Sequence, residues 1–206
     1  MVITISPSGR DSKFNDLATL KIRHKRGTID TPNRIVNKHD HSAKDAIGAN
    51  IPLTRISKSF IIQENIDPEI LGNILTKNGY LNQMLIKTKT WADKVGNKDA
   101  LVLLYPNLTK DAVKELDTSE KRKKFVRFFS NLALEMDIES IMMPVVNSFS
   151  EIKSAVNLEK LQIIPVIDLP QSTEEFTKKY DECKLEASED IPILAFKFAP
   201  YPRANI

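Results

Sequence analysis

The stretch IMMPVVNSFSEIKSAVNLEKLQIIPVIDLPQSTEE, residues 141–175, decides the fold of this chain. It holds two short apolar runs, 141–146 and 163–169. Each run ends in a loop bearing Pro, Asn or Asp, and an amphipathic helical pattern follows. Strands that alternate with helices are typical of βα units feeding a parallel sheet. Ligands bind at the carboxyl ends of the strands in such sheets, so the pattern also predicts where a site lies.

The same alternation continues on both sides of this stretch. Apolar runs at 101–105 and 193–199 predict two further strands. The intervals between the four runs are those expected of βα units, and no sequence repeat accompanies them. Helices are predicted from the capping boxes Ser148 with Glu151 and Ser172 with Glu175, from the Asp67-Pro68 N-cap, over 80–91, and from Asp117 with Glu120.

Two features qualify the predicted sheet. Pro144 and Pro165 lie within the runs and argue against central strands, because proline lacks the N–H that a ladder needs. No helical pattern follows the last run, whereas a complete eightfold barrel needs ~250 residues. The prediction is an α/β fold that is (β/α) barrel-like, either a partial barrel, such as the N-terminal part of a larger one, or a small open parallel sheet.

The N-terminal third is predicted in less detail. Residues 1–16 are polar and are expected to form a flexible arm, while 17–206 form a single α/β domain. Strand patterns at 17–22 and 28–36 flank a turn, which predicts a β-hairpin. Further elements are predicted at 42–47 (helix), 51–56 and 60–63 (strands).

Composition is ordinary for a soluble globular protein, with 41% hydrophobic and 28% charged residues among 206. No apolar stretch approaches the ~20 residues of a membrane span, and the first residues lack the pattern of a secretory signal. Cys183 is the only cysteine, which excludes an internal disulfide and a thiolate-rich zinc site. These observations predict a cytoplasmic protein without a membrane partner.

Positive charge is concentrated near the N-terminus. Residues 1–60 contain eleven Lys/Arg and five Asp/Glu, although the whole chain carries a net charge of only +3. A localised basic segment can attract the phosphates of RNA or DNA. The alternative is a solvated hairpin edge, where cations deter edge-to-edge pairing. The residues concerned are Lys21, Arg23, Lys25, Arg26, Arg34 and Lys38.

Two charged residues in the predicted strands are candidates for catalysis. Asp168 ends the run 163–168, where barrel enzymes place catalytic groups; alternatively, it is a loop carboxylate that accepts backbone hydrogen bonds. Lys197 alternates with phenylalanines in the last run and could act as a desolvated Schiff-base nucleophile. The alternative for Lys197 is an amine that reaches solvent from the strand end.

Polar residues after other strands could line the same rim and bind a substrate; they are Asn107, Asn147 and Arg203. A second possibility is a divalent metal, because His39 and His41 lie on alternate positions of an extended segment and point the same way. A two-histidine site is weak without further ligands. No glycine-rich phosphate motif is present. Apart from this possible divalent metal, the sequence leaves the cofactor unknown.

Two segments resemble the tRNA-guanine transglycosylase family. One is Arg26-Gly27-Thr28-Ile29-Asp30-Thr31-Pro32, followed by Ile47-Gly48-Ala49-Asn50-Ile51, which is similar to the opening of that family. The other is Val166-Ile167-Asp168-Leu169-Pro170 and the helix after it. The resemblance implies a (β/α) barrel that exchanges a base in tRNA through a covalent aspartate nucleophile. It also implies that Asp168 recognises the guanine base.

The chain departs from that family in its Asp-Ser-Gly-Gly turn, its Gly-rich strand and its Cys/His zinc cluster, none of which has a counterpart in these residues. The resemblance therefore implies a divergent or catalytically incomplete domain. Two other functions remain open on the sequence. One is a metal-dependent hydrolase using His39 and His41, and the other is a non-catalytic interaction domain.

Overall fold

Two β-sheets and a layer of helices make up the described part of the chain. The computed structural model describes residues 4–10, 18–30, 35–36, 59–95, 100–169, 172–186 and 194–198. The elements are β1 (Thr4–Arg10), β2 (Ala18–His24), β3 (Gly27–Asp30), β4 (Ile35–Val36), β5 (Ser59–Ile66), α3 (Pro68–Thr76), α4 (Tyr80–Val95), β6 (Leu101–Leu108), α5 (Lys110–Glu115), α6 (Ser119–Glu135), β7 (Ser140–Pro144), α7 (Phe149–Lys153), β8 (Gln162–Leu169), α8 (Thr173–Glu186) and β9 (Ala195–Phe198).

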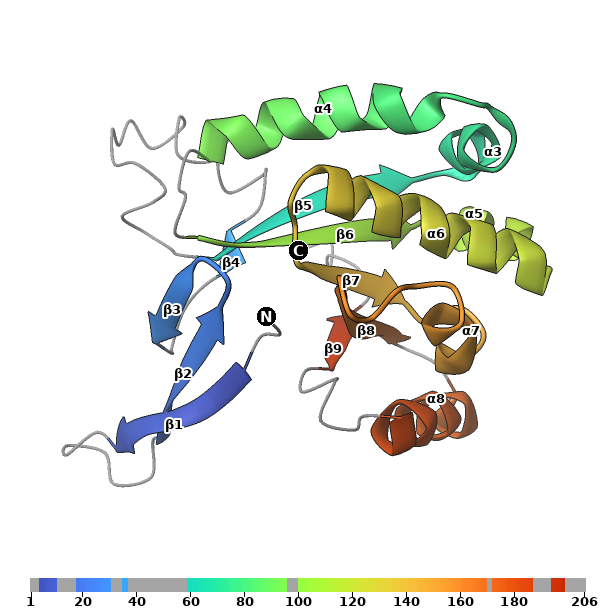
Figure 1. Cartoon of the computed structure of the whole chain (residues 1–206). Coiled ribbons are helices and arrows are strands. Elements are labelled where there is room, and N and C mark those ends of the chain that lie inside the picture. Colours follow the sequence, from blue (N-terminus) through green and yellow to red (C-terminus); the bar gives the residue numbers. More distant parts are fainter. Residues whose placement is uncertain are drawn as a thin grey trace, which may run out of the picture.

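The larger sheet has its strands in chain order, from β4 to β9, and every neighbouring pair is parallel. Right-handed crossovers between successive strands place their helices on the same side of a sheet. Figure 1 shows the sheet curled into a half-barrel with α3, α4, α6, α7 and α8 around its outside. This confirms the predicted α/β, barrel-like fold. The helix side of the sheet is called the outer face below, and the opposite side the inner face.

The main core lies between the outer face and the helices. Leu104, Ile141 and Ile167 of the sheet belong to it, and α6 contributes Phe125 and Phe129, whose rings lie 5.0 Å apart. The two phenylalanines are one helical turn apart, so both face the sheet. Burying one such ring stabilises the fold by about 2–3 kcal/mol. Phe125 and Phe129 therefore belong to a stripe of this helix that faces the core.

A three-stranded antiparallel sheet, β1–β2–β3, confirms the predicted hairpin. Ile29 of β3 packs with Leu101, Leu103 and Ile164 of the inner face. Within the segment expected to form a flexible arm, residues 4–10 form β1, which pairs with β2. Pairing uses backbone groups, so the polar composition of β1 concealed the strand.

Pro165 lies inside β8 without interrupting its pairing. Backbone groups of a parallel strand point alternately to its two neighbours. Gln162 N donates to Glu139 O at 2.8 Å and Val145 N donates to Val166 O at 2.9 Å, both on the β7 side. Pro165 therefore faces β9, and the described pairing with β9 starts only at Val166. The missing N–H costs no bond in the described ladder.

Pro144 has the opposite effect, together with a proline that the sequence reasoning did not single out. The described pairing between β6 and β7 ends at Leu104 and Ile141. By the same alternation, the next donors between these two strands would be the N–H groups of Pro106 and Pro144, which do not exist. The β6–β7 ladder therefore stops short of the carboxyl ends of its strands.

Side-chain caps start the helices where the sequence predicted them, with small shifts. Asp67 Oδ1 accepts from Ile70 N at 2.8 Å at the start of α3. The cap of α6 is Thr118, one residue after the predicted Asp117. The structure adds α5, which was not predicted, and lengthens the strand predicted at 60–63 to β5. Helix caps at Ser148 and Ser172 are confirmed by hydrogen bonds from Glu151 N and Glu175 N. The elements predicted at 42–47 and 51–56 lie outside the described residues.

Candidate functional site

Polar side chains gather on the inner face at the carboxyl ends of four strands. The register pairs Asn65 of β5 with Asn107 of β6, and Asp168 of β8 with Lys197 of β9. These residues share the strand face of the inner apolar cluster, because alternate residues of a strand point to the same side. We call the set the inner-rim cluster, and its members are Gln63, Asn65, Tyr105, Asn107, Asp168 and Lys197.

A chain of hydrogen bonds links the β5 and β6 members. Asn107 Nδ2 donates to Asn65 Oδ1 at 2.8 Å, and Gln63 Nε2 donates to the same oxygen at 2.9 Å. Tyr105 Oη donates to Asn107 Oδ1 at 3.3 Å. One side-chain oxygen thus receives two donors, which orients both neighbouring amides. The cluster presents a preorganised row of amide groups along two strands.

The charged half of the cluster lies on β8 and β9. Lys197 Nζ is 3.5 Å from Asp168 Oδ1 and donates to Leu108 O, also at 3.5 Å. Leu108 belongs to β6, so the lysine reaches across the inner face above the part of β6 and β7 where the ladder has stopped. The side chains of Asp168 and Lys197 are 45% and 31% exposed. Both side chains are therefore partly exposed at the rim, although Asp168 Oδ1, the oxygen nearest Lys197, is itself buried.

Tyr105 connects the two halves electrostatically. Its side chain is buried, and burial raises the pKa of the Tyr105 phenol above its ordinary value, with the negative charge of Asp168 adding to the effect. The phenol therefore stays protonated at neutral and mildly alkaline pH and acts as a hydrogen-bond donor. The cluster combines one carboxylate acceptor, one ammonium donor, one phenol donor and amides that both donate and accept.

Three of the predicted site residues, Asn107, Asp168 and Lys197, are brought together in this cluster. Asn147 lies elsewhere, on the exposed loop before α7, where its side chain hydrogen-bonds to Glu151. The catalytic and substrate-binding roles predicted for Asn107, Asn147, Asp168 and Lys197 stay predictions. The other candidates, Arg34, His39, His41 and Arg203, lie outside the described residues. Within the described ranges, no group of three or more His, Cys, Asp or Glu side chains is placed to hold a metal ion.

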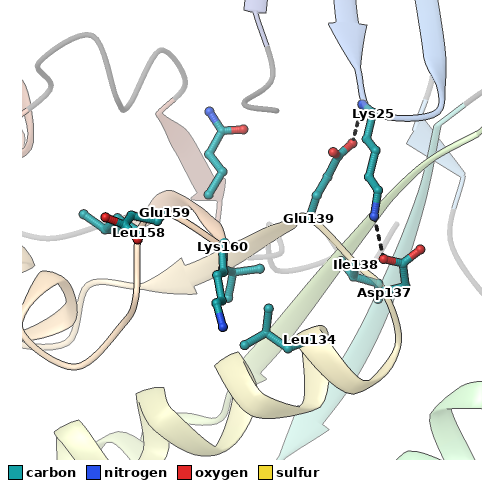
Figure 2. A pocket seen from close by; sticks show the side chains of 10 residues that line it. Lys25, Leu134, Asp137, Ile138, Glu139, Leu158, Glu159 and Lys160 are labelled. Atoms are coloured by element: carbon teal, nitrogen blue, oxygen red, sulfur yellow. Dashed lines mark hydrogen bonds and ion pairs between the residues drawn. The ribbon is translucent and has the colours of Figure 1, made fainter.

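The basic hairpin turn is engaged with the body of the protein. Figure 2 shows Lys25 bound to two carboxylates: its Nζ lies 2.7 Å from Asp137 Oδ1, and its backbone N donates to Glu139 Oε1 at 2.9 Å. Arg26 Nη2 donates to Asp137 O at 2.9 Å. Asp137 and Glu139 lie between α6 and β7, at the amino ends of the strands. Arg23 is exposed on β2 and Lys21 is half-buried, and nucleic-acid binding by this segment stays a prediction.

A cavity of about 150 Å³ lies beside this turn, and Figure 2 shows its lining. Both acidic and basic side chains line it, among them Asp137, Glu139, Lys25 and Lys160. It is located at the amino ends of the strands. Parallel sheets of this kind bind ligands at the opposite end, so the inner-rim cluster is the better candidate site.

Sequence reasoning missed Gln63, Asn65 and Tyr105. They could have been predicted from alternate residues of a strand, which lie on one face and become polar at one end of the strand. In β5 the residues at positions 61, 63 and 65 share a face that changes from apolar Ile to polar Gln and Asn toward the carboxyl end. The prediction ended that strand at residue 63, so Asn65 was not considered.

Comparison of the chain with protein-family models, with curated proteins and with solved structures found no match in any of the three. Among the described residues, none of the helices combines the length and apolar character that crossing a membrane requires.

Proposed function

We propose that this chain is a divergent transglycosylase-like domain whose inner-rim cluster binds a nucleobase of RNA. The observation that carries the proposal is the Asp168–Lys197 pair beside Tyr105 and Asn107, at the carboxyl ends of parallel strands. That end of the sheet is where barrel-type enzymes bind substrates. The resemblance around residues 166–170 independently implies base recognition by Asp168.

The chemistry of the cluster suits a purine edge. Proteins read an extruded base by hydrogen bonds to its Watson–Crick edge. One carboxylate oxygen of Asp168, Oδ1, is buried beside Lys197. The other oxygen would accept from guanine, which presents two adjacent donors, N1–H and the 2-amino group. The ammonium of Lys197, 3.5 Å from Asp168 Oδ1, keeps the carboxylate in place. Asn65 and Asn107 supply amide donors and acceptors for the rest of the base.

Base exchange breaks one N-glycosidic bond and makes another, which requires a nucleophile in addition to a base-binding group. Asp168 is the only carboxylate of the inner-rim cluster, and we assign it to base recognition. We assign Lys197 to positioning that carboxylate. The described part of the chain therefore supports base binding directly, and exchange is the reaction that the family resemblance adds.

The test compares single-stranded RNA oligomers that contain guanosine or inosine at one position, since inosine lacks the 2-amino group. Fluorescence anisotropy should show tighter binding of the guanosine oligomer, by about tenfold, because one good polar contact to a base discriminates by about 1–3 kcal/mol. Asp168→Asn should abolish the preference. Incorporation of labelled guanine into RNA by the unmodified protein then tests for exchange.

The matched control is Asp111→Asn, which removes an exposed carboxylate on α5 that pairs only with a neighbouring lysine, Lys114, in the described contacts. Circular dichroism of each variant reports whether the fold is retained. The proposal fails if the unmodified protein does not discriminate between the two oligomers. It also fails if Asp168→Asn binds both of them as the unmodified protein does.

A further inference from the structure

Helix α6 carries a cationic groove on its surface, distinct from the basic hairpin. The groove is lined by Ser119, Glu120, Lys123, Lys124 and Arg127, and its volume is about 560 Å³. Three of the five residues are cationic and one is anionic. Lys123 and Arg127 are four residues apart, so their side chains lie on the same side of the helix.

Most cations of this helix are already engaged, but two are available. Lys121 Nζ lies 2.9 Å from Asp117 Oδ1, and Arg122 is bound to Glu151. Lys124 donates to the carbonyl of Leu75, at the end of α3. Among the described residues, the side chains of Lys123 and Arg127 form no ion pair or hydrogen bond. Arg127 is exposed and Lys123 is half-buried, and Glu120 is the one carboxylate that lines the groove with them.

The groove lies at the same end of the half-barrel as the inner-rim cluster. Helix α6 follows β6, so its first turn starts at the carboxyl ends of the strands. At 1.5 Å per residue, Lys123 and Arg127 are ~6 and ~12 Å along the helix from Ser119. Lys25 and Arg26, by contrast, are at the amino ends, where Asp137 and Glu139 hold them. The groove is thus the cationic surface nearer to the candidate base site.

We propose that the α6 groove binds the phosphate backbone of the RNA strand whose base enters the inner-rim cluster; this rests on the proposed function. Two strand spacings along the sheet (~10 Å together), one layer across it (~10 Å) and ~6–12 Å along the helix separate the groove from Asp168 by on the order of 20 Å. A single strand of several nucleotides covers that distance. Lys123 and Arg127 lie on one face of α6, and their positive charges complement successive phosphates of the RNA strand.

The experiment uses the full chain with Lys123→Gln and Arg127→Gln combined. The affinity for a guanosine-containing single-stranded RNA of twelve or so nucleotides is measured between 50 and 200 mM salt, together with the affinity for free guanine by calorimetry. Each lost phosphate contact lowers the salt slope of single-strand binding by about 0.7, so the double variant should lose about 1.4. RNA binding at 50 mM salt should weaken about tenfold, while binding of free guanine stays unchanged.

The matched control is Lys89→Gln with Lys160→Gln, which removes two exposed cations outside the groove. It should leave the salt slope as it is. If the Lys123→Gln/Arg127→Gln variant keeps the salt slope of the unmodified protein, the groove proposal is wrong. It is also wrong if the protein binds free guanine but no RNA. Base recognition by Asp168 survives both results. The groove proposal is likewise wrong if the protein binds phosphatidylserine vesicles and does not bind RNA. If neither RNA nor guanine binds, the groove proposal and the proposed function fail together.

Discussion

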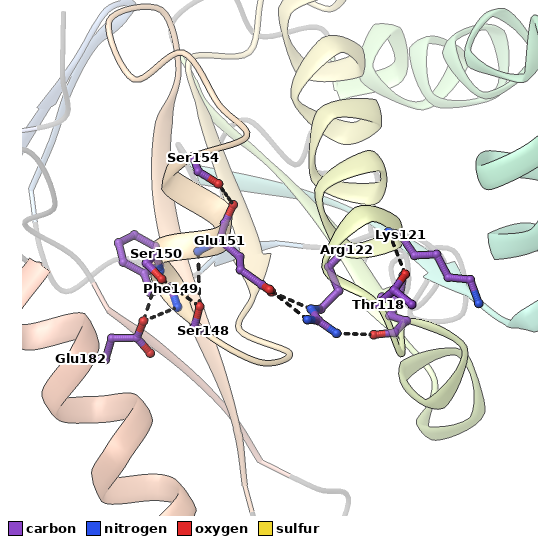
Figure 3. A network of polar contacts seen from close by, with 10 residues as sticks. Thr118, Lys121, Arg122, Ser148, Phe149, Ser150, Glu151, Ser154 and Glu182 are labelled. Atoms are coloured by element: carbon purple, nitrogen blue, oxygen red, sulfur yellow. Dashed lines mark hydrogen bonds and ion pairs between the residues drawn. The ribbon is translucent and has the colours of Figure 1, made fainter.

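Arg122 of α6 holds Glu151 of α7 through two parallel hydrogen bonds. Its Nε donates to Glu151 Oε2 at 2.6 Å and its Nη2 donates to Oε1 at 2.9 Å (Figure 3). A third donor, Nη1, reaches Leu116 O at 2.9 Å. Both side chains are largely buried, with 16% and 17% of their surfaces exposed. Planar, charge-assisted pairs of this kind are stronger and more directional than ordinary surface ion pairs.

The Arg122–Glu151 pair predicts a specific loss of stability in acid. The hydrogen bond from Arg122 is the main reason that the pKa of Glu151 falls from its ordinary value of 4.5 to about 2. The folded pKa lies below the unfolded one, so the stabilisation is complete above pH 4.5 and is lost as the pH falls toward 2. Glu151→Gln should lower the free energy of unfolding by about 1 kcal/mol at pH 7.

Urea denaturation between pH 2 and pH 7 measures this effect. The difference between the unmodified protein and Glu151→Gln should shrink toward zero as the pH approaches 2. Glu159→Gln, a change at an exposed carboxylate between α7 and β8, serves as the control. Its free energy of unfolding should vary with pH in parallel with that of the unmodified protein. A constant difference for Glu151→Gln across the whole range would contradict the assignment.

His24 predicts a second pH dependence, closer to neutrality. Its side chain is fully buried at the end of β2, and its Nδ1 accepts from Arg26 N at 3.4 Å. Burial lowers the pKa of His24; the nearby Glu139 opposes this and Arg26 reinforces it. The unfolded state therefore binds the proton more readily, so stability is complete above pH 6.5 and declines as the pH falls toward the folded pKa.

Replacement of His24 by Asn isolates this contribution, because Asn Oδ1 offers an acceptor near the position of Nδ1 and does not titrate. The unmodified protein should lose stability between pH 7.5 and pH 5, as measured by urea denaturation, and the His24→Asn variant should lose less. Equal slopes in the two proteins would show that His24 is not responsible. The other histidines are unchanged in both proteins and cancel in the comparison.

Tyr105 links the candidate site to a spectroscopic measurement. Burial and the charge of Asp168 raise the pKa of its phenol above the ordinary value of 10.0. The absorbance difference at 295 nm between the unmodified protein and Tyr105→Phe should therefore show no titration near pH 10 in the folded state. The same difference should titrate near pH 10 in denaturant.

The Tyr105→Phe variant also removes the hydrogen bond to Asn107. Stability should fall by about 1 kcal/mol, the net contribution of one such bond. Combined with Asp168→Asn, the absorbance experiment tests the electrostatic link: without the negative charge at residue 168, Tyr105 should titrate at lower pH than in the unmodified protein. An unchanged titration would show that burial alone sets its pKa.

Local patterns in the sequence predicted much of the outer layer. The helix caps at Ser148 and Ser172 were confirmed because a cap depends on hydrogen bonds within three residues of the chain. The apolar runs became β6 to β9 for a similar reason, since strand propensity and burial show in adjacent residues. Pro165 looked like an objection to the sheet only because the sequence does not show which neighbour its missing N–H would face.

The sequence by itself determined the α/β alternation, the helix starts and a polar residue, Asp168, at a strand end. Only the tertiary structure decided which residues meet that aspartate. The pairing with Lys197 depends on the β8–β9 register, and the contact of Lys197 with Leu108 depends on how strongly the sheet curls. Register and curl arise from contacts between residues far apart in the chain, whose geometry no local pattern encodes. The same reason explains why the hairpin cations proved to be engaged with Asp137 and Glu139, while α6 carries the available charge.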